Sequence, residues 1–411
     1  MLICIFTGFT SGLPLYILIQ LVPAWLRTEG VSLKEIGLFA LIGFPYVWKF
    51  LWSPFMDRFT PPFLGRRRGW MLITQISLFI SIIYMGQLNP TTSLWPIAYL
   101  AAAVAFFSAS QDIVLDAYRR ELLNDEQLGI GNSIHVQAYR IAGLVPGSLG
   151  LILADHFQWS TVFIFISAFM FVGILMTFFI KEANTTPRPP ETLLLAVEEP
   201  FMEFHTRLGL EKMIIFVLFL ILYKLGDNMA TALQTPFYID VGFSLTEIGI
   251  IAKFSSLASV IAGGLLAGII MIKLSINRAL WVFGFIQIMS ILGFAFLNEI
   301  GPVEWVLAVV ISFEYLGVGL GATALVAFMA RETNPNYAAT QLALFTAVAA
   351  LPRTFANAIT GYIVESVGWT QFFFICTALA IPGMLMLFKV APWNGEGTLQ
   401  NSGTSHQSSN S

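Results

Sequence analysis

The sequence has few charged residues and almost no cysteine. Of its 411 residues only 11% are charged and only two are Cys, whereas 57% are hydrophobic. A soluble domain carries roughly 25% charged residues, so this composition favours a membrane protein. Without a C-x-x-C pair or a His/Cys cluster, we expect no disulfide framework, no metal site and no cofactor.

Signatures of catalysis and of nucleic-acid binding are missing as well. The chain has no H-E-x-x-H, G-x-S-x-G, S-x-x-K or phosphate-binding loop, so we predict that it is not an enzyme and disfavour an ATP-driven pump. A net charge of −3 argues against nucleic acid as a partner. The first 20 residues have no basic start and no small-residue cleavage site, so we expect them to remain as a membrane helix.

Apolar runs of membrane-spanning length recur along the chain between short polar breaks. A helix needs about 20 apolar residues to cross the hydrocarbon core, and lipid offers no partners for free backbone groups. We therefore predict an all-α membrane protein with twelve transmembrane helices. Their expected spans are residues 1–26, 36–56, 70–88, 94–117, 130–153, 159–180, 213–238, 246–272, 279–297, 303–330, 339–364 and 369–390.

Basic residues between these spans are strongly asymmetric. One set of loops holds fourteen Lys and Arg, and the opposite set holds only Arg27 and Lys34. The positive-inside rule then puts both termini in the cytoplasm. The longest polar break, residues 182–211, is the expected cytoplasmic linker between an N-terminal bundle (1–181) and a C-terminal bundle (212–390). Residues 391–411 are rich in Ser, Asn and Gly and are expected to form a disordered tail.

An internal repeat supports the division into halves. Ser32-Leu-Lys-Glu-Ile-Gly37 opens the second predicted helix and Ser244-Leu-Thr-Glu-Ile-Gly249 opens the eighth. A looser pair is Tyr139-Arg140 and Pro352-Arg353, each followed by Gly and then Trp. Two parallel six-helix repeats with substrate near the midplane are the plan of major facilitator transporters.

Charged residues inside the apolar spans are the strongest candidates for function. A charge at the centre of a membrane helix costs about 2.5–3.5 kcal/mol on insertion scales, so each needs a partner, water or cargo. The basic members are Lys49, Arg140, Lys224, Lys253 and Arg353, and the acidic ones are Asp112, Asp116, Asp227 and Glu314. The slightly positive sum suits an anionic cargo bearing a carboxylate or a peptide. Structural ion pairs are the alternative for each residue.

Roles within this charged set follow from the repeat and from spacing. Arg140 and Arg353, matched across the halves, are expected to clamp cargo carboxylates, with the three lysines tuning the field. Lys224 and Asp227 lie three residues apart on one helical face and could pair locally. Asp112, Asp227 and Asp116 are the candidates for binding and releasing a proton during transport.

A Gly-Arg cluster follows the second predicted helix. The chain reads Ser53-Pro-Phe-Met-Asp57-Arg58 and then Gly65-Arg66-Arg67-Arg68. It resembles the signature loop of the major facilitator superfamily, whose Asp and Arg groups lock the two halves together on the cytoplasmic side. The resemblance implies a gating role for these six residues: Asp57, Arg58, Gly65, Arg66, Arg67 and Arg68. An ordinary positive-inside loop is the alternative.

Longer strings resemble the AmpG-type muropeptide permeases of that superfamily. They include Lys49-Phe-Leu-Trp-Ser-Pro54, Ser108-Ala-Ser-Gln111-Asp112, Leu222-Tyr-Lys-Leu-Gly-Asp227 and Ala339-Thr-Gln341. Gln111 and Gln341 within them are added as substrate-binding candidates. Two positions depart from the family pattern, since Ala252 precedes Lys253 where relatives often have Asn, and Pro352 precedes Arg353 where Gly is usual.

The resemblance implies a multi-pass permease of the bacterial inner membrane. It would import GlcNAc–1,6-anhydro-MurNAc and its peptides with protons for cell-wall recycling, as a monomer, with a link to β-lactamase induction. The alternatives are a facilitator for another large anionic solute such as an acyl-CoA, a membrane enzyme acting on lipid-linked sugars, and a sensor that binds without transport.

Overall fold

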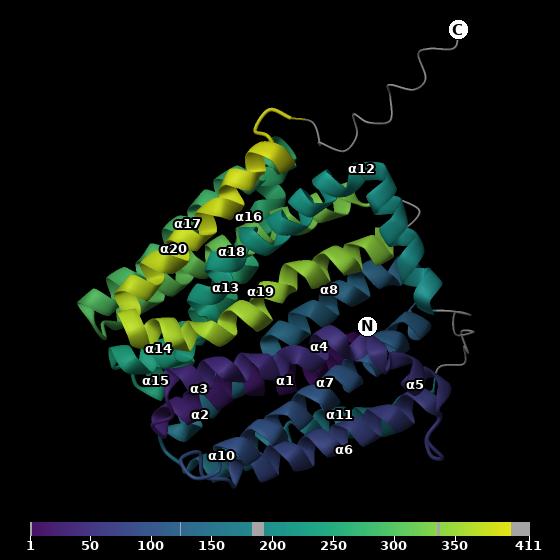
Figure 1. Cartoon of the computed structure of the whole chain (residues 1–411). Coiled ribbons are helices and arrows are strands. Elements are labelled where there is room, and N and C mark those ends of the chain that lie inside the picture. Colours follow the sequence, from purple (N-terminus) through teal and green to yellow (C-terminus); the bar gives the residue numbers. More distant parts are fainter. Residues whose placement is uncertain (1, 124, 183–192, 335–337, 396–411) are drawn as a thin grey trace. The chain divides into compact units, whose positions relative to one another are not determined.

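The computed structural model describes residues 2–123, 125–182, 193–334 and 338–395 (Figure 1). Every regular element in those ranges is a helix, which confirms the prediction of an all-α protein. The chain divides into two compact units: unit 1 is Met1–Pro189 with Thr235–Phe254, and unit 2 is Pro190–Gln234 with Ser255–Ser411. The domain boundaries at residues 181 and 212, taken from the polar linker, stay a prediction.

Unit 1 contains the first predicted bundle and a short segment from the second half of the sequence. Helices α1 and α8, and helices α6 and α7, pack side by side in it. Its helices are α1 (Leu2–Tyr16), η1 (Ile17–Leu21), α2 (Val22–Thr28), α3 (Leu33–Leu38), η2 (Phe39–Gly43), α4 (Phe44–Trp48), η3 (Lys49–Leu51), α5 (Ser53–Arg58), α6 (Arg66–Gly86), α7 (Leu94–Leu122), α8 (Asp125–Ala142), η4 (Val145–Leu149), α9 (Gly150–Ala154), α10 (Trp159–Ala168), α11 (Met170–Phe179), α14 (Gln234–Val241), α15 (Leu245–Glu247) and η5 (Ile248–Ala252).

Unit 2 is built from fewer and longer helices. Helix α17 packs against α18 and α20, and α13 packs against α19 and α20. A phenylalanine-rich core that includes Phe204, Phe216, Phe219 and Phe328 holds the unit together. Its helices are α12 (Leu193–Tyr223), α13 (Leu225–Ala232), α16 (Lys253–Lys273), α17 (Ile276–Ile300), α18 (Glu304–Glu332), α19 (Ala338–Val367) and α20 (Trp369–Val390).

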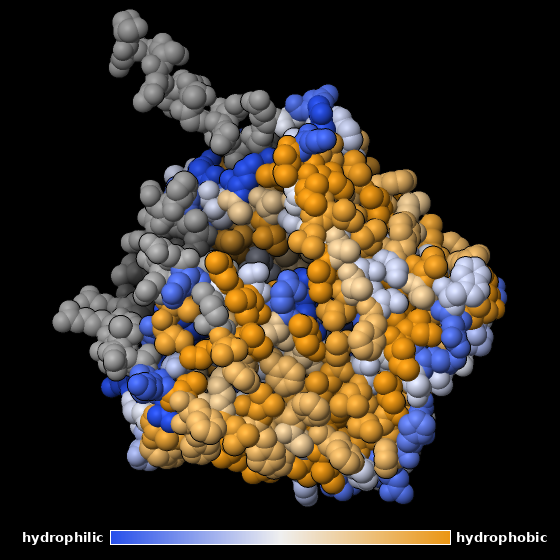
Figure 2. Space-filling model, turned by 180° about the vertical axis from the view of Figure 1, so that it is seen from behind, coloured by the Kyte–Doolittle hydropathy of each residue, from blue (hydrophilic) through white to orange (hydrophobic). Residues whose placement is uncertain are grey.

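Nine helices in the described part of the chain are long and apolar enough to cross a membrane. Large apolar side chains such as Phe179 (85% exposed) and Ile272 (82% exposed) point outward. Figure 2 shows hydrophobic residues over most of one face, with hydrophilic residues gathered mainly toward its margins. A soluble protein rarely exposes apolar patches of more than a few hundred Å², so a surface of this kind belongs in lipid.

The predicted second span, residues 36–56, is interrupted. The structure divides it into α3, η2, α4, η3 and α5, so 3₁₀ turns replace one continuous helix. Pro45 and Pro54 each stand at the start of an α-helical piece. Proline has no N–H to donate and fits only the first turn of a helix, so each one restarts the helix.

Both copies of the sequence repeat begin a helix in the same way. Ser32 Oγ accepts a hydrogen bond from the Glu35 N–H at 3.3 Å, and Ser244 Oγ accepts one from the Glu247 N–H at 3.2 Å. In each case the glutamate reaches back to the serine N–H, which completes a capping box. The predicted helix starts at these two serines are therefore confirmed.

The linker and the tail contain more structure than their composition indicates. Residues 193–211 of the predicted linker lie in α12, which bends at Gly209 where φ is +74°. Residues 391–395 of the predicted tail are bound to α17, because Asn277 Nδ2 donates to the carbonyls of Pro392 (3.0 Å) and Gly395 (2.8 Å). Residues 183–192 and 396–411 lie outside the described residues.

Candidate functional site

The Gly-Arg loop forms the start of α6. Gly65 has φ +88°, a left-handed conformation that favours glycine. The carboxylate of Glu182 accepts hydrogen bonds from the N–H groups of Arg67 (2.7 Å) and Arg68 (3.1 Å). The N-terminus of a helix presents free N–H groups and a positive dipole, so a carboxylate is stabilised there.

The arginine side chains of this loop tie three helices of unit 1 together. Arg67 Nη2 lies 2.6 Å from Glu121 Oε1 on α7, and Arg66 Nη2 lies 3.4 Å from the same oxygen. Arg68 donates to the carbonyls of Thr177 (2.9 Å) and Phe178 (3.0 Å) at the end of α11. These contacts lie within unit 1, and the gating role stays a prediction. Arg58 is exposed, and the side chain of Asp57 lies outside the described residues.

A polar cluster in unit 1 surrounds Asp112 on α7. Ser11 of α1 donates to Asp112 Oδ1 at 2.6 Å, and the ammonium of the half-buried Lys49 acts electrostatically on the same carboxylate. Asp116, one turn further along, pairs with Arg119 at 2.9 Å and is 51% exposed. The structure therefore joins two predicted residues, Lys49 and Asp112, and places Asp116 in a separate ion pair.

The other predicted residues of unit 1 occupy three different environments. Arg140 is half-buried near the end of α8. Lys253 is buried, and its stem passes close to Gly147 of η4. Gln111 is fully buried and donates to the Thr10 carbonyl at 3.0 Å. That hydrogen bond holds the Gln111 amide between α7 and α1.

In unit 2 the charges gather around Asp227. Lys224 lies between α12 and α13, and its Nζ is 2.9 Å from Asp227 Oδ2, which confirms the predicted local pair. Glu314 of α18 is 0% exposed and accepts a hydrogen bond from Ser290 Oγ of α17 at 2.5 Å. The carboxylates of Glu314 and Asp227 act on each other electrostatically.

Arg353 and Gln341 lie on α19 in very different surroundings. Arg353 is exposed. Gln341 is fully buried; its Nε2 donates to Glu203 at 2.5 Å and its Oε1 accepts from the Asn334 N–H at 2.8 Å. Arg207 also pairs with Glu203, at 3.0 Å. Partial burial raises the pKa of Glu203, but the hydrogen bonds from Asn334 and Gln341 and the charge of Arg207 outweigh it and leave that pKa below its usual range.

Two of the five predicted cations, Arg140 and Arg353, are arginines. Among the described residues no carboxylate forms an ion pair with Arg140 or with Arg353. Lys224, by contrast, is paired with Asp227. An unpaired guanidinium offers a rigid fork of donors that matches a carboxylate, so Arg140 and Arg353 are the cations best suited to an anionic ligand.

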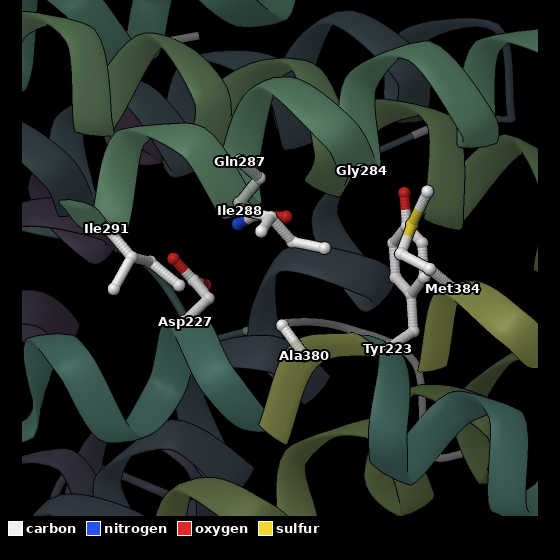
Figure 3. A pocket seen from close by; sticks show the side chains of 8 residues that line it. All are labelled: Tyr223, Asp227, Gly284, Gln287, Ile288, Ile291, Ala380 and Met384. Carbon is white, nitrogen blue, oxygen red and sulfur yellow. The ribbon is translucent and has the colours of Figure 1, made fainter. Parts of the chain in front are cut away.

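A small cavity lies beside the acidic cluster of unit 2 (Figure 3). In that view the Asp227 carboxylate and the Gln287 amide point toward the same space between α13, α17 and α20. The remaining walls are apolar except for the Tyr223 hydroxyl, which donates to the Leu280 carbonyl at 2.9 Å. The lining residues are Tyr223, Asp227, Gly284, Gln287, Ile288, Ile291, Ala380 and Met384.

Sequence reasoning missed several partners in these clusters. Glu121 and Glu182 each follow a predicted span next to the arginine-rich loop, and that proximity in the topology could have indicated them. Ser11, Ser290 and Gln287 gave no signal, because small polar residues are common in membrane helices. Glu314 was recognised as a carboxylate inside a span, but it received no role.

Comparisons with known proteins agree with this geometry. The Major Facilitator Superfamily profile matches residues 4–357. An uncharacterized protein of Haemophilus influenzae is 50% identical over 98% of this chain and 97% of its own length. The anhydromuropeptide permease of Escherichia coli is 41% identical over 94% of this chain and 78% of its own length. A crystal structure of the nucleoside transporter NupG has a TM-score of 0.74 at 14% identity, covering 94% of this chain and 98% of that one.

The Escherichia coli relative is a permease and the solved structure is a transporter, which is consistent with a transporter rather than an enzyme. The family match and the apolar helices indicate a multi-pass protein of the bacterial inner membrane. The chain belongs to the AmpG-type permeases of the Major Facilitator Superfamily.

Proposed function

We propose that the protein is a permease that imports anhydro-muropeptides, GlcNAc–1,6-anhydro-MurNAc and its peptides, into the cytoplasm for cell-wall recycling. The observation that supports this cargo best is the 41% identity to the Escherichia coli anhydromuropeptide permease over 94% of the chain. The proton-motive force drives the import, and the imported muropeptides can feed a β-lactamase induction pathway. Its proposed small-molecule partners are protons and the muropeptide, and its proposed working form is a monomer in the lipid bilayer.

The proposed topology has twelve transmembrane helices with both termini in the cytoplasm. Nine apolar helices of spanning length and the fourteen-to-two distribution of basic residues between loops support it. The three further spans are the interrupted segment 36–56, the region of α12 to α14, and α19. Each is helical in the structure.

Cargo recognition is assigned to the cations of the apolar segments. Arg140 in unit 1 and Arg353 in unit 2 hold carboxylates of the peptide or of the muramyl lactyl group, since neither has an acidic partner among the described residues. Lys49 and Lys253 contribute positive potential, whereas Lys224 is neutralised by Asp227. Gln111 and Gln341 support the helices around them, because both amides are held by protein groups.

Proton coupling is assigned to Asp112 and Asp227 rather than to Asp116. Asp112 accepts a hydrogen bond from Ser11 and is under the electrostatic influence of Lys49. Its half-buried carboxylate can therefore bind and release a proton in place. Asp227 is buried beside a second carboxylate. Asp116 is largely exposed and paired with Arg119, which fits a structural role.

The Gly-Arg loop is proposed to brace the cytoplasmic ends of α6, α7 and α11 during gating. The support is the set of contacts that Arg66, Arg67 and Arg68 make with Glu121, Glu182 and the end of α11. A brace of this kind keeps the helix ends of unit 1 moving as one body. Asp57 and Arg58 are included in this proposal because they belong to the same loop.

Uptake into proteoliposomes tests the cargo. We expect radiolabelled GlcNAc–anhydro-MurNAc tripeptide to accumulate under an inward proton gradient and to be displaced by the unlabelled compound. An acyl-CoA, as a large anion of different chemistry, should not compete. Absence of saturable muropeptide uptake, or equal competition by acyl-CoA, would overturn the proposed cargo.

A further inference from the structure

Glu314 and Asp227 are two buried carboxylates, and each has one oxygen without a hydrogen-bond donor among the described residues. Both are almost completely inaccessible, at 0% and 6% exposure, and each has one oxygen already bound. Glu314 Oε2 is bound to Ser290 Oγ at 2.5 Å, and Asp227 Oδ2 is bound to Lys224 Nζ at 2.9 Å. The remaining oxygens, Oε1 and Oδ1, have no hydrogen-bond donor in the part of the chain that the structure describes.

Unpaired acceptors of this kind are costly away from water. An unsatisfied buried polar group is destabilising, and more so if it is charged. Asp227 and Glu314 act on each other electrostatically, and two ionised carboxylates repel. A proton on one of them removes this repulsion and gives that carboxyl a hydrogen to donate.

The local charge balance leads to the same result. The buried groups acting on Glu314 are Asp227 and Lys224, so two carboxylates face one ammonium. With both acids ionised the cluster has a net charge of −1, and one proton makes it neutral. A neutral cluster avoids the desolvation cost that a lone buried charge carries in a membrane protein.

Among the described residues, no other group close to the pair carries a positive charge that would balance the second carboxylate. The titratable and charged side chains that face the pair from neighbouring helices are neutral or exposed ones: Tyr223, Tyr315, Cys376 and Arg353. Of these only Arg353 is charged, and it is exposed and acts on Tyr315.

We propose that Glu314 and Asp227 share one exchangeable proton, so that Glu314 is a further coupling residue of the transporter. The inference rests on the proposed proton-driven uptake. The cavity between Asp227 and Gln287 has a volume of about 10 Å³, room for about one water molecule. Gln287 Nε2 also lacks a partner, so it can orient a water that passes the proton between the pair and the outside.

The shared proton has a direct spectroscopic test. Infrared spectra of the purified full-length protein at neutral pH should contain the C=O stretching band of a protonated carboxyl. We expect that band to disappear in Glu314→Gln and in Asp227→Asn, and to persist in Glu332→Gln. Glu332 is the matched control because it is also buried on α18 but is bound to Arg331 at 3.0 Å. Absence of the band in the wild type, or its survival in Glu314→Gln, would overturn the proposal.

Transport separates this proposal from the general one. Glu314→Gln carries a permanent amide, so gradient-driven accumulation should fall at least about tenfold while gradient-free exchange of labelled muropeptide stays within about twofold. Retained exchange shows that the variant is folded. Wild-type accumulation in Glu314→Gln would contradict the coupling role. The two proposals can also fail separately. If uptake by the wild type does not respond to the proton gradient, the proposed proton-driven function is wrong. If the carboxyl band is nevertheless absent from Glu314→Gln, the shared proton is still supported.

Discussion

At the residue scale, the charges inside apolar segments divide by what they contact. Lys224 is neutralised by Asp227, whereas Arg140 and Arg353 lack an acidic partner in the described part of the chain. The spacing of three residues was enough to predict the first pair. The contact of Asp112 with Ser11 joins residues 101 positions apart, and no local pattern could have indicated it.

Replacing the unpaired arginines tests the cargo clamp. Arg140→Ala or Arg353→Ala should raise the muropeptide concentration at half-maximal uptake about 10- to 100-fold, because a hydrogen bond to a charged group is worth about 1.5–3 kcal/mol. Lysine at either position should recover only part of the loss, since it cannot bind a carboxylate through two parallel donors.

Arg278→Ala is the matched control for these variants. Its guanidinium donates to Asn394 at 3.1 Å and lies over the Trp393 ring, so it is bound to residues that follow α20. Uptake should be unchanged in this variant. If Arg140→Ala and Arg353→Ala both match it, these two side chains do not bind cargo.

At the element scale, the start of α6 shows what sequence can and cannot predict. The Gly-Arg pattern indicated a loop with a role beyond simple connection. It could not indicate that Glu182, more than a hundred residues away, accepts from the first N–H groups of α6. At residues 36–56 the apolar composition predicted one span, but composition does not show where 3₁₀ turns replace the α-helix.

Alanine at Gly65 should destabilise the protein through this helix start. A left-handed conformation costs a non-glycine residue about 1–2 kcal/mol. A Cβ at Gly65 would also lie 2.8 Å from the Glu182 side chain and displace the carboxylate that caps α6. Thermal unfolding in detergent should therefore show a larger loss for Gly65→Ala than the backbone effect alone produces.

Gly30→Ala isolates that backbone effect. Gly30 has φ +85° but no atom within 4 Å of a Cβ. We expect Gly30→Ala to lose only the conformational part of the stability. Equal melting temperatures for the two variants would show that Glu182 contributes nothing at this position.

At the scale of the whole molecule, segmentation and repetition predicted most of the fold. Apolar runs and the repeated Ser-Leu-x-Glu-Ile-Gly string indicated an all-helical major facilitator transporter, which the structure and the family match confirm. The count of twelve membrane helices stays a prediction. The grouping of Thr235–Phe254 with unit 1 was beyond reach. It depends on tertiary contacts such as the 2.6 Å ion pair between Arg27 and Asp240, which only the folded chain brings together.

The central claim is that muropeptide and protons move together, and one measurement tests it most directly. Proteoliposomes loaded with a pH-sensitive dye, without any imposed gradient, should acidify internally when the anhydro-muropeptide is added outside, at a rate that follows uptake of the labelled compound. Saturable muropeptide uptake with no internal acidification would contradict the account.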